Sequence, residues 1–159
     1  MENDGVFVDR AKPEDLPDML RLLESLFSLE ADFSFDATRQ RRGLEMLLRQ
    51  GDRVAVLVAR APDRQVVGMV TVQLVISTAE GNYSAWLEDV VVQNSWRGMG
   101  IGRSLVEAAL DWARAKGARR AQLLADQDNG SALGFYARLG WRPSNMNMLR
   151  MMIEPGSQE

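Results

Sequence analysis

The chain has 159 residues, of which 46% are hydrophobic and 26% charged, as in a single globular domain. Its net charge of −3 does not favour nucleic-acid binding, which needs a basic surface. It has no cysteine and no histidine, which excludes disulfides, thiolate nucleophiles, Cys/His zinc sites and Ser-His-Asp triads. We expect no metal, and acid–base chemistry must come from Asp, Glu, Tyr, Lys or the termini.

The sequence gives no sign of targeting or of internal division. Met1–Asp9 is acidic and lacks the apolar stretch of a signal peptide. Charges interrupt the longest apolar runs well short of the ~20 residues that a membrane span needs. We therefore expect a cytoplasmic protein that does not bind membranes. Without repeats or a long linker, residues 1–159 are predicted to form one domain with a frayed tail at Glu154–Glu159.

The first third of the chain predicts a strand and two helices. Val6–Arg10 alternates like a strand, and the prolines that follow it stand where helices start. A second helix is expected from an N-cap at Asp36 to Arg49, with Gly51 as the stop signal. The first helix shows its buried face by helical spacing of Leu16, Met19, Leu20, Leu23, Leu26 and Phe27.

The middle of the chain is rich in Val, Ile and Thr, which predicts strands. We expect them at Val54–Arg60, Val66–Thr78 and Ala85–Gln93, with turns at Pro62–Gln65 and Ala79–Ser84.

The last third alternates helices and strands. The predicted elements are a helix over Ile101–Lys116, a strand over Ala121–Ala125, a helix over Ser131–Leu139 and one or two strands within Trp141–Ile153. Gly117 and Gly140 follow the two helices as C-terminal caps. The order β-α-α-β-β-β-α-β-α-β predicts an α/β fold with a mixed sheet and helices on both faces.

Three alternate glycines stand between a predicted strand and a predicted helix, in Arg97-Gly98-Met99-Gly100-Ile101-Gly102. Glycines let the backbone approach a ligand, and a helix N-terminus carries partial positive charge, so this junction could seat a phosphate or pyrophosphate. A plain turn explains the glycines as well. A dinucleotide-binding fingerprint fits less well, because Arg103 stands where its third glycine belongs.

Arg97-x-x-Gly100-x-Gly102 resembles the Q/R-x-x-G-x-G/A motif of the GNAT superfamily of acetyl-CoA-dependent N-acetyltransferases. Asn129 followed by Ala132-Leu133-Gly134-Phe135-Tyr136 and Gly140-Trp141 resembles the second signature of the same family. The order of elements from Val6 is also similar, so the resemblance covers nearly the whole chain. It implies a mixed, mostly antiparallel sheet of the acyl-CoA N-acyltransferase type, with acetyl-CoA bound and CoA released as product.

The resemblance also implies the residues that bind the cofactor. The amides of Gly98, Met99, Gly100, Ile101, Gly102 and Arg103 would hold the CoA pyrophosphate, with the side chains of Arg97 and Ser104. Val90, Val91 and Val92 would pair with the pantetheine arm, and an amide near Val91 would polarise the thioester carbonyl. Asn129 would bond to the pantetheine, and Phe135 and Tyr136 would line the cofactor.

Two side chains are candidates for proton transfer. Tyr136 is the candidate general acid, which would protonate the departing CoA thiolate; otherwise it is an aromatic on the buried side of a short helix. Glu88 is the candidate base, because an amine must lose a proton to attack and a buried Glu has a raised pKa. Glu88 or Asp89 could instead pair with an arginine. Strand alternation predicts Trp86, Glu88, Val90 and Val92 on one face and Leu87, Asp89 and Val91 on the other.

The connection between the first two helices is a candidate acceptor site. Phe27, Glu30 and Phe33 would form it with Glu88, since an acidic and aromatic rim suits a cationic amine with an apolar body. The simpler interpretation is that most of these residues are ordinary helix-end acids and core phenylalanines. Met146, Met148, Met151 and Met152 either fill core gaps or mark the edge of a homodimer.

The favoured function is direct transfer of acetyl from acetyl-CoA to a primary amine of a small molecule. Three alternatives remain open at this point. One is a protein N-terminal or lysine acetyltransferase, another an inactive acyl-CoA-binding module, and the third a nucleotide binder of Rossmann type.

Overall fold

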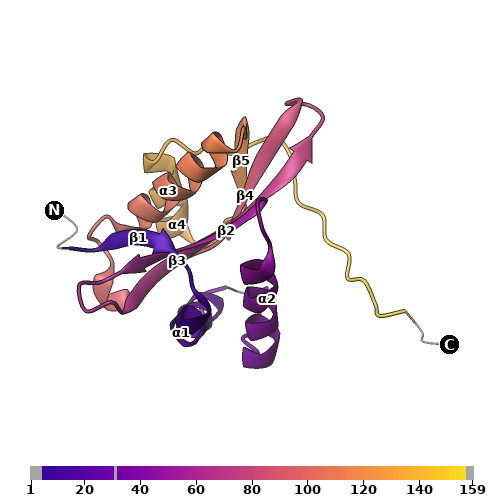
Figure 1. The fold of residues 1–159 in the computed structure, drawn as a ribbon. Helices are drawn as coiled ribbons and strands as arrows, with labels where there is room; N and C mark the ends of the chain where they lie inside the picture. The colour runs from indigo at the N-terminus through magenta and orange to yellow at the C-terminus, as the bar shows by residue number, and fades with distance from the viewer. Residues whose placement is uncertain (1–4, 31, 157–159) are drawn as a thin grey trace. The chain divides into compact units, whose positions relative to one another are not determined.

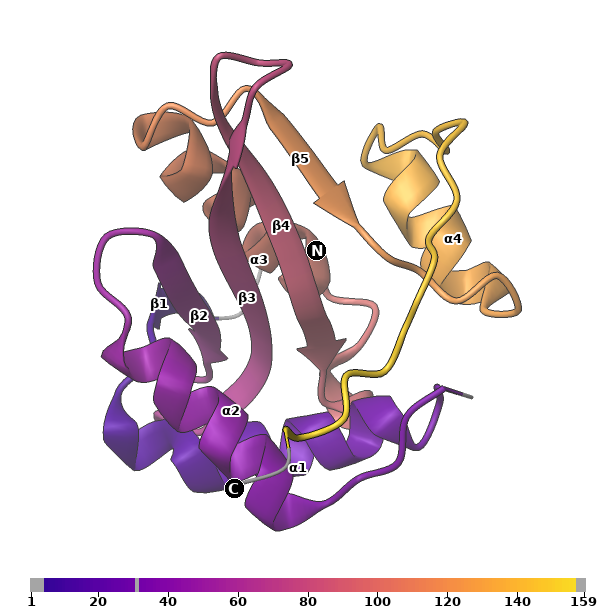
Figure 2. The same cartoon turned by 90° about the vertical axis from the view of Figure 1, so that its right-hand side faces the viewer.

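The described part of the chain, residues 5–30 and 32–156 of a computed structural model, is built on a five-stranded sheet. It divides into two compact units, Met1–Leu124 and Ala125–Glu159. The first contains the sheet, and the second contains the helix α4, Gly130–Arg138 (Figures 1 and 2). That the chain folds as a single domain stays a prediction.

The sheet of the first unit has the strand order β1-β2-β3-β4-β5. Each of the first four strands pairs antiparallel with the next, and β5 runs parallel to β4. The prediction of a mixed, mostly antiparallel sheet is therefore confirmed. The strands are β1 Phe7–Arg10, β2 Val54–Arg60, β3 Val66–Ser77, β4 Asn82–Val92 and β5 Arg120–Leu123. Strand β4 starts three residues before the expected Ala85, because the turn needs only the residues from Thr78 to Gly81.

Three helices of the first unit cover the two faces of this sheet. They are α1 Leu16–Phe27, α2 Ala37–Arg49 and α3 Ile101–Ala115. In Figure 1, α1 and α2 lie on one side of the strands and α3 on the other. Asp36 caps α2 as predicted, since its side chain accepts from the amides of Thr38 and Arg39. Gly117 ends α3 at φ +97°, and Ala118 N–H donates to the Ala113 carbonyl at 3.0 Å.

Apolar side chains fill both interfaces between helices and sheet. On the α3 side, β3 comes so close that a Cβ on Gly68 would lie 3.0 Å from Leu105 Cδ1. On the other side, α1 buries Leu16, Met19 and Leu23 of its predicted face together with Leu22, while the remaining predicted residues, Leu20, Leu26 and Phe27, are half-buried. The core on that side consists of Leu16, Met19, Leu22, Leu23, Leu44, Val56, Val58, Val66, Met69 and Val91.

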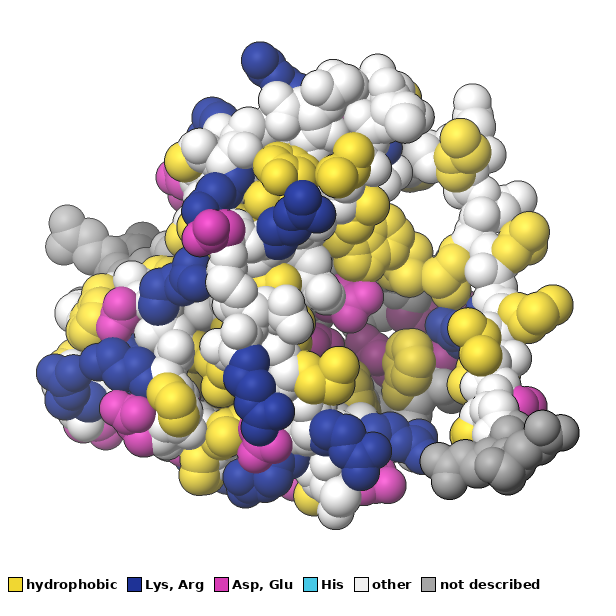
Figure 3. All heavy atoms as spheres, turned by 45° about the vertical axis from the view of Figure 1, so that its right-hand side comes forward, with side chains coloured by type: hydrophobic (Ala, Val, Ile, Leu, Met, Phe, Trp, Pro, Cys, Tyr) yellow, Lys and Arg dark blue, Asp and Glu magenta, His cyan; other side chains and the backbone are white. Residues whose placement is uncertain are grey.

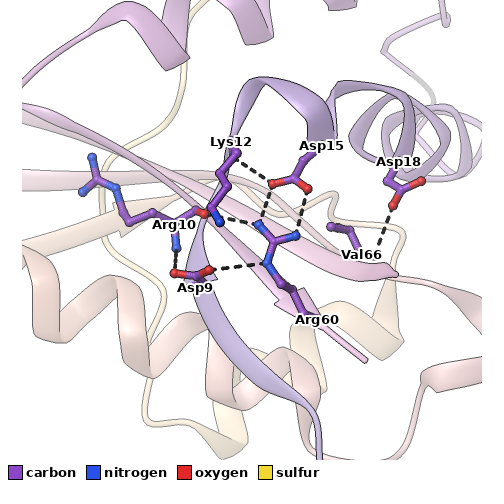
Figure 4. A network of polar contacts seen from close by, with 7 residues as sticks. All are labelled: Asp9, Arg10, Lys12, Asp15, Asp18, Arg60 and Val66. Atoms are coloured by element: carbon purple, nitrogen blue, oxygen red, sulfur yellow. Dashed lines mark hydrogen bonds and ion pairs between the residues drawn. The ribbon is translucent and has the colours of Figure 1, made fainter. Parts of the chain in front are cut away.

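A buried arginine joins β1, β2 and the start of α1 (Figure 4). Arg60 of β2 donates to both carboxylate oxygens of Asp15, at 2.8 and 2.7 Å, and to Asp9 at 3.4 Å. The Lys12 amide also donates to Asp15. Burial raises the pKa of Asp15, but the hydrogen bonds from Arg60 and Lys12 outweigh it, and the pKa lies below its ordinary value. Contact with Asp15 in turn raises the pKa of Arg60.

The second unit begins with a loop and then α4, which ends at Gly140 with φ +93° as predicted. The prediction of strands within Trp141–Ile153 is wrong, since residues 141–156 contain neither strand nor helix. An apolar segment forms a strand only where a neighbouring strand offers backbone hydrogen bonds. Here Met146, Leu149, Met151 and Ile153 are exposed instead.

The structure describes the two ends of the chain only in part. Of the expected frayed tail, residues 154–156 have no regular structure and residues 157–159 lie outside the described part. Residues 1–4 of the acidic N-terminal segment also lie outside it. No helix in the described part is long and apolar enough to cross a membrane.

Candidate active site

The glycine loop between β4 and α3 has the backbone of an anion seat. Gly98 and Gly100 have φ values of +79° and +78°, a left-handed conformation that suits glycine. Gly100 is the N-cap of α3 and has no side chain to satisfy the first amides of the helix. Those amides have no acceptor within the helix and point outward at its positive end. A Cβ on Gly98 would meet nothing within 4 Å, so the loop is open to a ligand.

The side chains around this loop leave its backbone accessible. Arg97 is exposed and donates from Nε to the Val92 carbonyl at 3.1 Å, which holds it over the end of β4. Ser104 donates from Oγ to the Gly100 carbonyl at 3.2 Å. Arg103 pairs with Glu107 at 2.7 Å, one turn further along the helix. Ile101 is buried, so only its backbone amide can serve a ligand, whereas Met99 and Gly102 are open to solvent to different degrees.

Strand β4 carries a bulge immediately before the three valines. Glu88 pairs with Thr71 and Val91 with Met69, so Asp89 and Val90 together oppose the single residue Val70. The buried hydroxyl of Thr71 donates to the Glu88 carbonyl at 3.1 Å and fixes the peptide that enters the bulge. Asp89 follows with φ +55°, a left-handed conformation that Asp tolerates better than most residues.

The bulge overturns the predicted alternation along β4. Val91 belongs to the core under α1 and α2, on the face of Trp86 and Glu88, and not on the opposite face. The extra residue shifts the alternation by one position, so all residues after it change sides. Of the predicted cofactor-binding valines, Val91 is buried, while Val90 and Val92 are half-buried.

The two carboxylates at the bulge differ in surroundings. Glu88 is exposed, and its Oε1 accepts from the indole N–H of Trp86 at 3.0 Å. Asp89 is half-buried, and burial, followed by the charges of Glu88 and Glu30, raises its pKa from 3.8 to about 7. Figure 3 shows acidic side chains, in magenta, gathered near the middle of the face it draws, with hydrophobic ones beside them.

One of the predicted acceptor residues, Glu30, acts electrostatically on β4. Glu30 is half-buried and lies close enough to Asp89 to influence its pKa. Phe27 and Phe33 contact each other with ring centroids 5.8 Å apart, and Phe33 is 50% exposed. The structure thus connects Glu30, Glu88 and Asp89, and it pairs the two phenylalanines.

The candidate residues of the second unit form a separate group on and around α4. Asn129 is the N-cap of α4, and its Oδ1 accepts from the Ala132 amide at 3.1 Å. Phe135 and Tyr136 meet edge to face at 5.1 Å, and Tyr136 and Trp141 do so at 6.0 Å. This capping role of Asn129 was not predicted, although an Asn just before a predicted helix is a typical N-cap.

The bulge at Asp89 and its hydrogen bond from Thr71 were not predicted from the sequence. No local signal marks a bulge in a run of β-forming residues, although an Asp can adopt positive φ.

Within the described residues, no group of three or more Asp, Glu, His or Cys is arranged to hold a metal ion.

Known proteins similar to this chain point to one enzyme class. The model of the Acetyltransferase (GNAT) family matches residues 16–141. An uncharacterised N-acetyltransferase of Archaeoglobus fulgidus is 31% identical over 132 residues, 82% of this chain and 88% of its own. An aminoglycoside N(6')-acetyltransferase type 1 of Stenotrophomonas maltophilia is 29% identical over 107 residues, 65% of this chain and 70% of its own.

Two further similarities differ in extent. An uncharacterised N-acetyltransferase of Methanocaldococcus jannaschii is 33% identical over 79 residues, and the chain spans only 35% of its length. An aminoglycoside acetyltransferase from an uncultured soil metagenomic sample, solved with sisomicin, has the same fold. It superposes with a TM-score of 0.72 and 24% identity over 97% of this chain and 99% of its own. Fold and similarity together define an acetyltransferase. The chain belongs to the GNAT family of N-acetyltransferases.

Proposed function

We propose that the protein transfers an acetyl group from acetyl-CoA to a primary amine of a small molecule. The observation that carries the proposal is the open backbone seat at Gly98–Gly100, directly before the N-terminus of α3, in a chain of the GNAT family. Membership in this family implies an acetyl-CoA donor. The acetyltransferase of Stenotrophomonas maltophilia, named for an aminoglycoside, favours a small-molecule acceptor over a protein.

The residues present suit a CoA pyrophosphate. The amides from Gly98 to Arg103 would hold it, because the first turn of a helix offers unpaired donors and positive potential. Arg97 and Ser104 stand beside these amides and would add side-chain donors. Val90, Val91 and Val92 would pair with the pantetheine arm through their main chain. From the second unit, Asn129, Phe135 and Tyr136 are proposed from their places in the motif.

The bound cofactor supplies an activated acetyl group as a thioester, and the chain supplies the proton transfers. Glu88 and Asp89 of β4 are the two carboxylates that could take the amine proton, and the motif spacing taken alone points to Glu88. An amide near Val91 stabilises negative charge on the carbonyl oxygen, which the bulge supports because it leaves backbone groups outside the ladder. The Tyr136 phenol would act as the general acid that protonates the CoA thiolate when it leaves.

The acceptor site is proposed at Phe27, Glu30, Phe33 and Glu88. Its acidic side chains suit an amine that arrives protonated, and the two contacting phenylalanine rings offer an apolar surface. Glu88 would serve there as a carboxylate that binds the ammonium group.

Calorimetric titration with acetyl-CoA, NAD and ATP tests the cofactor assignment. We expect micromolar affinity for acetyl-CoA alone, lost in Gly98→Glu. Gly81→Glu is the matched control, because Gly81 also has positive φ and open space but lies in the β3–β4 turn. Binding of NAD or ATP in place of acetyl-CoA would support a nucleotide binder and end the transferase proposal.

A screen of amines by thiol release tests turnover. We expect Tyr136→Phe to lower the transfer rate by about 10²-fold, in the range for general acids, with unchanged affinity for acetyl-CoA. Tyr83→Phe, on the hairpin end of β4, is the control and should keep full activity. Binding without any turnover would indicate an inactive module, and turnover of peptides alone would indicate a protein acetyltransferase.

A further inference from the structure

We infer that Asp89, and not its neighbour Glu88, accepts the proton of the amine during acetyl transfer, while Glu88 attracts the ammonium group. The inference rests on the proposed transferase function and assigns one catalytic residue within that site. It follows from the position of Asp89 in the β4 bulge, from the charges of its neighbours Glu88 and Glu30, and from its burial.

The bulge gives Asp89 a fixed place beside the chain's other acceptor residues. Two residues of β4 oppose one of β3 there, and Asp89 has φ +55°. Thr71, 1% exposed, donates its hydroxyl proton to the Glu88 carbonyl at 3.1 Å and so holds the peptide between Glu88 and Asp89. A base on a fixed backbone needs little reorganisation when the substrate binds. Thr71 is therefore a positioning residue for Asp89.

Glu88 is less suited to take the proton. Its carboxylate is exposed to water and already accepts a hydrogen bond from the Trp86 indole at 3.0 Å. Water and the Trp86 indole therefore compete with the amine for the carboxylate oxygens of Glu88. An exposed carboxylate is well suited to draw an ammonium group toward the site.

The groups that act on Asp89 favour proton uptake. Burial is the largest influence, followed by Glu88 on its own strand and Glu30 in the segment after α1. Together they raise the pKa of Asp89 to about 7, where a base has both a useful ionised fraction and a strong affinity for a proton. The same three carboxylates would bind a cationic amine more tightly than a neutral one.

The proton transfer balances without another reagent. The N–H bond of the ammonium group breaks, its electron pair stays on nitrogen, and the proton binds a carboxylate oxygen of Asp89. The neutral amine then has the lone pair that attacks the acetyl carbon. The nitrogen loses its second proton as the amide forms, and this proton replaces, through solvent, the one that Tyr136 would give to the departing sulfur. Asp89 returns the proton to solvent before the next turnover.

The test compares Asp89→Asn with Glu88→Gln. It measures kcat and KM as a function of pH, the affinity for acetyl-CoA, and the titration of the side-chain carboxyl groups by ¹³C NMR. Wild type should show a kcat/KM that falls below pH ~7, and its Asp89 signal should titrate in the same range without substrate. Asp89→Asn should lose about 10²-fold or more in kcat/KM, and it should also lose the acidic limb of the profile, which is the fall in kcat/KM at low pH. Glu88→Gln should keep the limb, moved to lower pH, and raise KM more than it lowers kcat.

The outcomes separate this inference from the proposed function. If Glu88→Gln abolishes the limb and Asp89→Asn keeps it, Glu88 is the base and the inference fails while the function stands. If wild type acetylates no amine, both fail. Thr71→Val should lower kcat and shift the Asp89 titration, and Thr71→Ser should restore both. Acetyl-CoA affinity should stay unchanged in every variant, which shows that the cofactor seat is intact.

Discussion

Two groups of carboxylates in the first unit have opposite electrostatic surroundings. At one edge of the sheet, Asp15 meets Arg60 through two hydrogen bonds, and its pKa is lowered. At the bulge of β4, Asp89 lies near Glu88 and Glu30, and its pKa is raised. The first arrangement stabilises the fold only while every charge keeps its partner. The second costs stability and leaves a group that can change its protonation at neutral pH.

The difference shows how to separate structural from functional carboxylates in this chain. Both are shielded from water, so burial alone does not distinguish them. The sign of the neighbouring charges does, because an arginine holds the carboxylate ionised and like charges favour its neutral form. Mutations at the two places should therefore have opposite effects on stability.

The largest effect is expected for Arg60→Met. Loss of the guanidinium leaves Asp15 buried without its cationic partner, which typically costs about 3–5 kcal/mol. Urea denaturation at pH 7 should show this as a lower free energy of unfolding. Arg49→Met is the control, since the exposed Arg49 lies 4.0 Å from Glu45 and should contribute less than about 1 kcal/mol. Equal losses in both variants would mean that the network is no more structural than a surface pair.

Asp89→Asn should have the opposite sign. Between pH 3.8 and about 7, folded Asp89 keeps a proton that the unfolded chain has released, so wild-type stability falls as the pH rises. The variant avoids this loss and should be about 2 kcal/mol more stable at pH 8, less than the full pKa shift would give. The gain should vanish near pH 4, and Asn accepts the positive φ. A destabilised variant at pH 8 would show that the Asp89 charge is compensated.

Asp15→Asn should show the reverse dependence on pH. Because its folded pKa is lowered, Asp15 contributes stability above its unfolded pKa and loses it as the pH falls through the folded value. The variant should be less stable at pH 7 by about 1.5 kcal/mol, as expected for a charge-assisted hydrogen bond. Acid titration of the unfolding free energy should bring the two proteins together at low pH. A gap that stays constant would exclude ionisation of Asp15 as its cause.

The smallest effect is expected for Glu30→Gln. Glu30 is the last of the three influences on Asp89, after burial and Glu88. Its neutralisation should lower the pKa of Asp89 slightly, and Glu88→Gln should lower it further. Carboxyl ¹³C NMR measures both shifts, with Glu45→Gln on α2 as a control that leaves Asp89 unchanged. An unchanged Asp89 in Glu30→Gln would remove Glu30 from the acceptor site.

Local sequence signals predicted the elements of the first unit well. The N-cap Asp36, the terminating Gly117 and the runs of Val, Ile and Thr act within a few residues of themselves. The same holds for the glycine loop, where positive φ at Gly98 and Gly100 follows from residue type. The bulge at Asp89 could not be predicted in this way, because it depends on how β4 registers against Thr71 and Met69 of β3.

The sequence by itself determined the class of fold, the family and the position of the glycine loop proposed to bind the pyrophosphate, because these rest on local periodicity, glycine chemistry and two motifs. Tertiary structure alone decided which side chains share an environment. It joined Arg60 to Asp15, across 45 residues, and brought Glu30 within range of Asp89. It also gave Met146–Ile153 no neighbouring strand to pair with, although a strand was predicted there. Such pairings depend on packing between distant segments, and pKa values follow from them.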